Sequence, residues 1–598
     1  MEEGHDATRI LAHAPGGGTG FSDAGFGDGV QRGTSHNNAG RHARTKEGAG
    51  ITATTGLGHS RCTASLGTTL EDRNIRSTHQ PERGTNTMSS SDNTKATDDS
   101  SGTNTPSADD TVKDTYSFIV VANRLPVDIE IDPDGTKHFE PSPGGLVTAL
   151  KPVLKEHEGA WIGWPGAASE GPTATPVADP FTTDEGITLI PMGLTKRDYA
   201  EYYEGFSNAT LWPLYHDLIV TPIFNRDWWV TYRDVNTRFA MEAARRAAEG
   251  ATVWVQDYQL QLLPGILRQM RPDLKIGFFL HIPFPPAELF RQLPWREELV
   301  RGLLGADVIG FHSIHNATNF LELSRDVGGF ATPSTGQPDS LPVRGKASMR
   351  EITATITASD GRPVGVGVFP ISIDTKSVTA AAKDADAEKV RSELGNPETL
   401  ILGVDRLDYT KGILQRLEAY EELLETGALD PETTTFVQVA TPSRERIEHY
   451  KVARRQVEEA VGRINGHFSS IGHSAVTYMH RSIPFPDLVS YYKAADIMLV
   501  TSLKDGMNLV AKEYVACHPD GTGSLVLSEF TGAAAELDGA FLCNPHDIDS
   551  IKRQVHSAAV AKKEDLRDRM MSIFNEVTEH DVHAWASAFL DCLESDND

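Results

Sequence analysis

The stretch "TVWVQDYQLQLLPGILRQMRPDLKIGFFLHIPF", residues 252–284, decides the fold class of this 598-residue chain. Two short apolar runs, 252–258 and 275–284, flank a segment at 260–272 whose apolar residues recur at helical spacing. A strand, a helix and a second strand in this order form a βαβ unit, whose strands lie parallel in one sheet. The stretch therefore predicts an α/β fold built on a parallel sheet.

The same alternation continues on both sides of this stretch. Upstream, "YSFIVVAN" (116–123) has the unbroken apolar character of a strand buried on both faces. A second series of strand and helix patterns begins after "VGVGVFPISID" (364–374). Two successive series predict two Rossmann-like doubly wound parallel-sheet domains, at 116–370 and 371–598, that face each other across a central cleft.

Residues 1–115 have a different texture. They are rich in Gly, Ser, Thr and Asp, as in "PGGGTGFSDAGFGDG" (15–29), and show no sustained apolar periodicity. Such a segment cannot bury enough apolar area to offset the entropy of ordering it. We predict a disordered N-terminal tail.

The composition excludes several classes of protein. A formal net charge of -27 argues against a nucleic-acid partner, because phosphate binding needs a basic face. No apolar run is long enough to span a membrane, and the N-terminus lacks the apolar region of a secretory signal. The cysteines are scattered without the spacing of a zinc site or a disulfide framework: Cys62, Cys517, Cys543 and Cys592. We expect a cytoplasmic protein, and the sequence leaves open whether it forms a homo-oligomer.

Two motif matches are better explained by ordinary structure. "IDPDGT" (131–136) fits the DxDGT pattern of aspartyl-phosphate phosphatases, but the residues before it alternate between apolar and charged, which favours a hairpin turn. The pair Gly345-Lys346 has Ser340 where a phosphate-binding P-loop needs its first glycine, so the P-loop pattern is absent.

Two stretches of the second series indicate a bound nucleotide diphosphate. "VDRLDYTKG" (404–412) places Arg406 and Lys411 at the carboxyl end of a strand, where a pyrophosphate is their expected partner. In "KDGMNLVAKEYV" (504–515), Asn508 can cap a helix that begins near Leu509, leaving free N–H groups for phosphate. Glu513, one turn further, can accept hydrogen bonds from both hydroxyls of a ribose.

Weaker signals come from the first series. Arg124 follows the first strand, and Gly144 and Gly145 open the next helix, which suits either an anion site or an ordinary strand–helix turn. Asp257 and His281 end neighbouring strands, where they could bind a polyol or could be satisfied core residues.

These stretches together resemble one family. "ANRLP", "GGL", "EYYEGFSNATLWPLYH", "FFLHIPFP", "RLDYTKG", "GRING" and "DGMNLVAKEYVA" occur in this order, and the resemblance covers about 118–595. The chain is similar to the trehalose-6-phosphate synthases, retaining glycosyltransferases of family 20 with two Rossmann-like domains (GT-B fold). The family transfers glucose from a nucleoside-diphosphate glucose, commonly UDP-glucose, to glucose 6-phosphate, giving α,α-trehalose 6-phosphate.

The resemblance implies a role for each site residue. Arg406, Lys411, His281 and Asp257 would form the catalytic centre, with Asp257 binding acceptor hydroxyls. The donor would be held by Gly144, Gly145, Arg406, Lys411, Ile483, Asp505, Leu509, Val510, Ala511, Lys512 and Glu513. Arg124, Tyr203 and Arg444 would bind the acceptor phosphate, while Trp212 and Ile282 would select the acceptor anomer. Ile483 stands where some members have Phe beside the nucleotide base, which leaves the nucleotide preference open.

The expected mechanism follows from the same residues. Retention without an evident carboxylate nucleophile suggests front-face attack, with the two cations stabilising the leaving pyrophosphate. We expect no metal and no cofactor. Three alternatives remain: an enzyme that uses glycerol 3-phosphate as acceptor, a bifunctional synthase–phosphatase, for which the end at Asp598 leaves no room, and a catalytically silent regulatory subunit.

Overall fold

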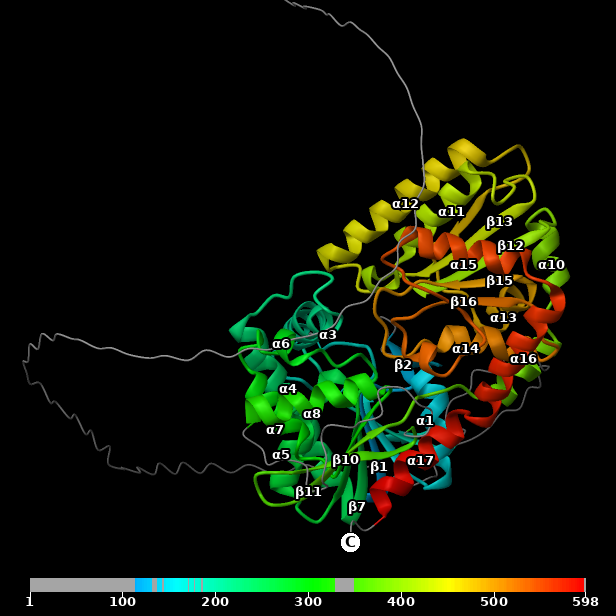
Figure 1. Cartoon of the computed structure of the whole chain (residues 1–598). Coiled ribbons are helices and arrows are strands. Elements are labelled where there is room, and N and C mark those ends of the chain that lie inside the picture. Colours follow the sequence, from blue (N-terminus) through cyan, green and yellow to red (C-terminus); the bar gives the residue numbers. More distant parts are fainter. Residues whose placement is uncertain are drawn as a thin grey trace, which may run out of the picture. The chain divides into compact units, whose positions relative to one another are not determined.

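Two mainly parallel sheets organise the protein in the computed structural model, which describes residues 113–131, 137–141, 145–169, 171–176, 178–183, 186–328 and 349–595 (Figure 1). The first sheet has nine strands, in the order β10 (Glu351–Thr357), β11 (Pro363–Val368), β9 (Val308–Phe311), β8 (Lys275–Phe279), β7 (Ala247–Gln256), β1 (Tyr116–Arg124), β4 (Ala160–Trp164), β6 (Thr188–Pro191) and β5 (Phe181–Thr182). Only its two edge strands, β10 and β5, pair antiparallel.

The second sheet has six strands, all parallel. Their order is β14 (Val476–Met479), β13 (Thr434–Thr441), β12 (Thr399–Arg406), β15 (Ile497–Val500), β16 (Ser524–Ser528) and β17 (Phe541–Cys543). Its inner strands β12, β15 and β16 are buried almost throughout, as their unbroken apolar runs predict. The predicted fold class, α/β with two parallel-sheet domains, is confirmed.

Each sheet reverses its strand order at one point. In the first sheet the chain runs from β1 through β4 to β6 on one side, and from β7 through β8 to β9 on the other. In the second, β12, β13 and β14 extend one way, and β15, β16 and β17 extend the other. Ligands in such sheets bind beyond the carboxyl ends of the strands at this switch point. The expected sites therefore lie beyond β1 and β7, and beyond β12 and β15.

Helices connect the strands of both sheets (Figure 1). Those of the first series are α1 (Gly145–Glu156), α2 (Lys196–Asp198), α3 (Trp212–Tyr215), α4 (Arg226–Arg246), α5 (Leu263–Met270), α6 (Ala287–Phe290), α7 (Arg296–Leu303) and α8 (Ile314–Gly328). Those of the second are α9 (Thr375–Lys383), α10 (Ala387–Glu393), α11 (Ile413–Glu425), α12 (Glu448–Phe468), α13 (Phe485–Ala494), α14 (Leu509–Ala516), α15 (Ile548–Val560) and α16 (Lys563–Glu579).

The last helix, α17 (Val582–Glu594, red in Figure 1), returns to the first sheet. The rings of Trp585 and Phe589 lie 5.1 Å and 4.7 Å from that of Trp254 in β7. Gly277 in β8 makes room for this helix, because a Cβ there would lie 2.7 Å from the Phe589 ring. The domain at 371–598 was predicted from chain order alone, which does not account for this helix.

Several smaller predictions can be compared with the described residues. The hairpin is confirmed, since β2 (Val127–Ile131) pairs antiparallel with β3 (Lys137–Pro141), although the turn at 132–136 lies outside the described residues. Residues 1–112 and the Gly345-Lys346 pair also lie outside them. Within the described ranges, no helix combines the length and apolar character that crossing a membrane requires.

Candidate functional site

Three predicted residues end strands of the first sheet. Arg124 ends β1, Asp257 directly follows β7, and His281 is the second residue after β8. Asp257 has a φ of 73°, in the left-handed region, and its backbone N–H donates to Phe279 O at 2.7 Å. Its Oδ1 accepts from the His281 N–H at 3.1 Å. Asp257 therefore joins the ends of β7 and β8 through both its backbone and its carboxylate.

Burial controls the ionisation of this pair. It raises the pKa of Asp257 to about 6, although backbone N–H groups and the charges of Arg444 and Arg406 act in the opposite direction. It also lowers the pKa of His281 well below its ordinary value. His281 is therefore neutral at pH 7, and a ring nitrogen, Nε2, lies 2.9 Å from Gln256 Oε1.

At the second sheet, Lys411 lies in a 3-10 turn (Tyr409–Lys411) that follows β12. The next residue, Gly412, has a φ of 61°, and a Cβ there would lie 2.1 Å from Thr501 O beyond β15, so only glycine fits. Beneath the turn, the buried Arg416 pairs with Asp405 at 2.7 Å and donates to Lys411 O at 2.9 Å. This buried arginine fixes the backbone that carries Lys411.

The two cations predicted for the pyrophosphate differ in their surroundings. Lys411 is buried, and its Nζ lies 2.5 Å from Asp505 Oδ2, which also accepts from Ser502 and Asn508 at 3.2 Å each. Burial opposes ionisation of Asp505, but Lys411 and Asn508 hold its pKa below the ordinary value. Arg406 is exposed.

Two acidic residues, Asp405 and Asp408, lie close to both cations in the sequence. The structure pairs Asp405 with Arg416 and Asp408 with Arg444 instead. A simple surface ion pair within "VDRLDYTKG" is therefore not what the structure contains.

The helix predicted near residue 509 is confirmed. α14 begins at Leu509, and Asn508 caps it, because its Oδ1 accepts from the Ala511 N–H at 2.9 Å. Glu513 accepts from the Tyr492 hydroxyl at 2.8 Å, and burial raises its pKa to about 7.

The other residues predicted to bind the donor substrate differ in their burial and contacts. The side chain of Lys512 is buried in an ion pair with Glu536 at 2.7 Å and donates to Ile371 O at 2.8 Å, so its ammonium is directed away from the predicted nucleotide site. Leu509, Val510 and Ile483 are half-buried, and Ala511 is buried. Gly145 begins α1, whereas Gly144 lies outside the described residues.

The predicted acceptor residues lie among aromatic rings. The Arg124 guanidinium lies 4.8 Å from the centre of the Trp164 ring, and burial lowers its pKa. Tyr203 belongs to a π-helix (Tyr199–Leu211) and stacks on Tyr199 at 5.4 Å. π-helical segments occur frequently at functional sites, because they displace side chains from α-helical register.

Residues of the two series meet at Trp212, which begins α3. Its ring lies beneath two guanidinium groups of the second series, Arg444 at 3.9 Å and Arg406 at 5.5 Å. Nearby, a Cβ on Gly506 would lie 2.4 Å from His281 O and 3.0 Å from Ile282 Cα. The loop before α14 therefore touches the backbone beyond β8, and predicted donor and acceptor residues share one site.

Sequence reasoning missed residues that hold this site together. Asp408, Tyr450, Tyr258 and Arg416 supply buried contacts to the predicted cations. Asp408 lies two residues after Arg406 and Tyr258 directly follows Asp257, so their neighbours could have indicated both, but Tyr450 lies in α12, outside every motif.

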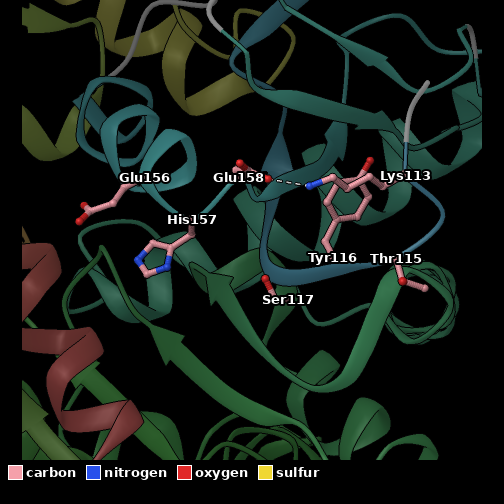
Figure 2. A pocket seen from close by; sticks show the side chains of 7 residues that line it. All are labelled: Lys113, Thr115, Tyr116, Ser117, Glu156, His157 and Glu158. Carbon is pink, nitrogen blue, oxygen red and sulfur yellow. Dashed lines mark hydrogen bonds and ion pairs between the residues drawn. The ribbon is translucent and has the colours of Figure 1, made fainter. Parts of the chain in front are cut away.

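A surface pocket lies at the other end of the first sheet (Figure 2). It is lined by Lys113, Thr115, Tyr116, Ser117, Glu156, His157 and Glu158, and Lys113 pairs with Glu158 at 2.7 Å. Tyr116 begins the nine-residue β1, so Arg124 at the far end is roughly 26 Å away. The pocket contains no predicted site residue. Among the described residues, no group of three His, Cys, Asp or Glu side chains could hold a metal ion.

Comparison with known proteins gives consistent matches. The family model described as glycosyltransferase family 20 matches residues 116–595. A trehalose-6-phosphate synthase of Mycolicibacterium vanbaalenii is 55% identical over 482 residues, which cover 80% of this chain and 96% of that protein.

Solved structures are similar over the same share of the chain. An alpha,alpha-trehalose-phosphate synthase (UDP-forming) from Burkholderia xenovorans, in complex with glucose-6-phosphate, has a TM-score of 0.71 at 31% identity, covering 80% of this chain and 100% of that one. A trehalose-6-phosphate structure from E. coli, bound with UDP-2-fluoro glucose, has a TM-score of 0.70 at 31% identity, covering 80% and 99%.

Proposed function

Because the chain belongs to glycosyltransferase family 20, as its sequence motifs indicated, we propose that it is a retaining hexosyltransferase that makes α,α-trehalose 6-phosphate. It transfers glucose from UDP-glucose to glucose 6-phosphate and releases UDP. One observation of this chain carries the proposal: Trp212 lies beneath both Arg444, a predicted acceptor residue, and Arg406, a predicted donor residue. A transferase must bring its two substrates together in this way.

The acceptor phosphate is bound by arginines held on aromatic rings. Arg444 and Arg124 provide the charge, and Tyr203 lies beside the Trp164 ring that supports Arg124, with ring centres 6.4 Å apart. The buried Nε of Arg444 has no hydrogen-bond partner among the described residues, so it can donate to a phosphate oxygen. Charge-assisted bonds of this kind select a phosphorylated sugar over a neutral one.

The donor lies beyond the second sheet. The first N–H groups of α14 form the positive end of the helix dipole and bind the pyrophosphate together with Arg406 and Lys411. Glu513, one turn inside the helix, accepts hydrogen bonds from the ribose hydroxyls. The Tyr492 hydroxyl uses one acceptor position on Glu513 Oε2, which leaves the other carboxylate oxygen to the ribose.

The transfer needs no covalent intermediate on the protein. The bond between glucose C1 and the β-phosphate oxygen breaks, and a bond from C1 to the acceptor hydroxyl oxygen forms on the same face. The hydroxyl proton passes to the departing phosphate oxygen. Arg406 and Lys411 stabilise the negative charge that develops there, while Asp257 and His281 hold sugar hydroxyls.

We propose that turnover needs no metal ion, because two cations already face the leaving group. Chelation by EDTA leaves the rate unchanged, and an abolished rate that magnesium restores contradicts this part of the proposal. We also propose a cytoplasmic location, supported by the free buried thiols of Cys517 and Cys543.

The purified protein tests the function directly. With UDP-glucose and glucose 6-phosphate it should release UDP and form a disaccharide phosphate, whose anomeric couplings by NMR show two α linkages. ADP- and GDP-glucose establish the nucleotide preference, and glycerol 3-phosphate tests the competing acceptor. Free phosphate would indicate a phosphatase activity. No transfer from any of the three donors to glucose 6-phosphate would overturn the proposal and favour a silent subunit.

A further inference from the structure

Asp408 contacts two parts of the site, the turn that carries Lys411 and the predicted acceptor residue Arg444. It is 2% exposed and caps the 3-10 turn of Lys411, since its Oδ1 accepts from the Thr410 N–H at 3.0 Å. Its other oxygen, Oδ2, accepts from the Tyr450 hydroxyl at 2.9 Å and from Arg444 Nη1 at 3.4 Å. One carboxylate therefore contacts both the donor-side turn and the acceptor-side arginine.

Arg444 is held on several sides by these neighbours. Besides the Asp408 contact, Nη1 donates to the Tyr450 hydroxyl at 2.5 Å and Nη2 donates to the Tyr258 hydroxyl at 3.1 Å. Its guanidinium lies 3.9 Å from the centre of the Trp212 ring, and its backbone has a φ of 49°. A non-glycine residue in this conformation is uncommon and needs surrounding contacts to hold it there.

The contacts leave one edge of the guanidinium for a ligand. Nη1 is used by Asp408 and Tyr450, whereas Nε is buried and has no partner among the described residues. Nε–H can therefore donate a charge-assisted hydrogen bond to a phosphate oxygen.

We propose that Asp408 is a positioning residue, which turns Arg444 so that its Nε edge meets the acceptor phosphate and ties this arginine to the turn that carries Lys411. The inference rests on the proposed function, because it assigns the phosphate to glucose 6-phosphate. Asp408 itself touches neither substrate, and acts through Arg444.

Asp408→Asn isolates the contact to Arg444. The amide keeps an oxygen for the Thr410 N–H but replaces Oδ2 with a donor, which cannot accept from Arg444. We expect KM for glucose 6-phosphate to rise about tenfold or more, the usual scale for a lost hydrogen bond to a charged group. The Kd of UDP, measured by calorimetry without acceptor, should change less than about threefold, since the donor-side bond is retained.

The decisive measurement is a double-mutant cycle with Arg444→Ala. If Asp408 acts through Arg444, Asp408→Asn should change KM for glucose 6-phosphate by less than about threefold in the Arg444→Ala background. Equal factors in both backgrounds would show a merely structural role and overturn the inference. Tyr450→Phe, which removes one hydroxyl from the same network, should give a smaller effect with the same dependence on Arg444, and it decides the question if Asp408→Asn does not fold.

Asp430→Asn is the matched control. Asp430 is exposed and makes the same local contact, accepting from the N–H two residues ahead at 3.0 Å, but it forms no ion pair with an arginine among the described residues. Its KM and kcat should equal those of the wild type. If the wild-type enzyme transfers no glucose to glucose 6-phosphate, the proposed function is overturned. If the wild type is active but the effects of Asp408→Asn and Arg444→Ala on KM are additive, only the role of Asp408 is overturned.

Discussion

Replacement of Lys411 by alanine should separate the catalytic role of this lysine from its structural one. Lys411 forms a buried ion pair with Asp505 at 2.5 Å, and their side chains are 11% and 16% exposed. In the proposed mechanism the same ammonium faces the leaving pyrophosphate. The variant therefore loses a stabiliser of the transition state and, at the same time, leaves Asp505 without its cation.

The two losses have different magnitudes. Removing a preorganised charge from a developing anion lowers kcat by about a hundredfold or more, or roughly 2.7–4 kcal/mol in the barrier. Leaving a buried carboxylate unpaired destabilises the fold by about 3 kcal/mol, the lower end of the usual range, because Ser502 and Asn508 still donate to Asp505. With an unfolding entropy near 2 cal/mol/K per residue over about 480 residues, Tm falls by roughly 3 °C.

A second substitution distinguishes these effects. In Lys411→Ala with Asp505→Asn, the unpaired charge is gone, so most of the lost stability should return while kcat stays low. Lys552→Ala is a control within the same domain, since Lys552 also pairs with acidic side chains, Glu422 and Asp549, but lies in α15 away from the site. It should leave kcat and the UDP affinity unchanged.

Steady-state kinetics, UDP calorimetry and thermal unfolding together test the reasoning. We expect kcat of Lys411→Ala to fall far more than the UDP affinity, because the charge on the leaving oxygen is greatest in the transition state. A folded Lys411→Ala enzyme with nearly normal turnover would refute the assignment of this lysine to the pyrophosphate. A loss of UDP affinity as large as the loss in kcat would refute the transition-state argument.

Three further outcomes are expected. Arg444→Ala should raise KM for glucose 6-phosphate by about ten- to a hundredfold, and an equal loss of UDP affinity would place this arginine on the donor side. A chain that begins at Asp114 should keep full specific activity, because β1 begins at Tyr116; a tenfold drop would contradict this. UDP affinity should rise as the pH increases through about 7, where Glu513 ionises and becomes a better acceptor for the ribose, and an unchanged slope in Glu513→Gln would exclude this group.

The sequence predicted the fold and the strand ends well, because both depend on local patterns. Unbroken apolar runs identify strands buried on both faces, and a polar residue directly after such a run lies at the carboxyl edge of the sheet. Arg124, Asp257 and Arg406 were all located in this way. The cap at Asn508 followed from the same local logic, since one side chain bonds to the N–H three residues ahead.

The pairing of charges could not be predicted. Lys411 has Asp405 and Asp408 close by in sequence, yet it pairs with Asp505, which lies after a different strand. Strand order decides this partner, because β12 and β15 are neighbours in the sheet although about ninety residues separate their ends. Lys512 shows the same limit: the family resemblance implied a donor contact, whereas its side chain reaches Glu536 and Ile371.

Aromatic rings explain how an acidic chain keeps cations ready for phosphorylated substrates. The face of a ring attracts a guanidinium without cancelling its charge and leaves its N–H groups to other partners. Arg124 lies on Trp164, and Arg406 and Arg444 lie on Trp212. Because Trp212 belongs to the first series and both arginines above it belong to the second, one ring of the first series supports two cations of the second.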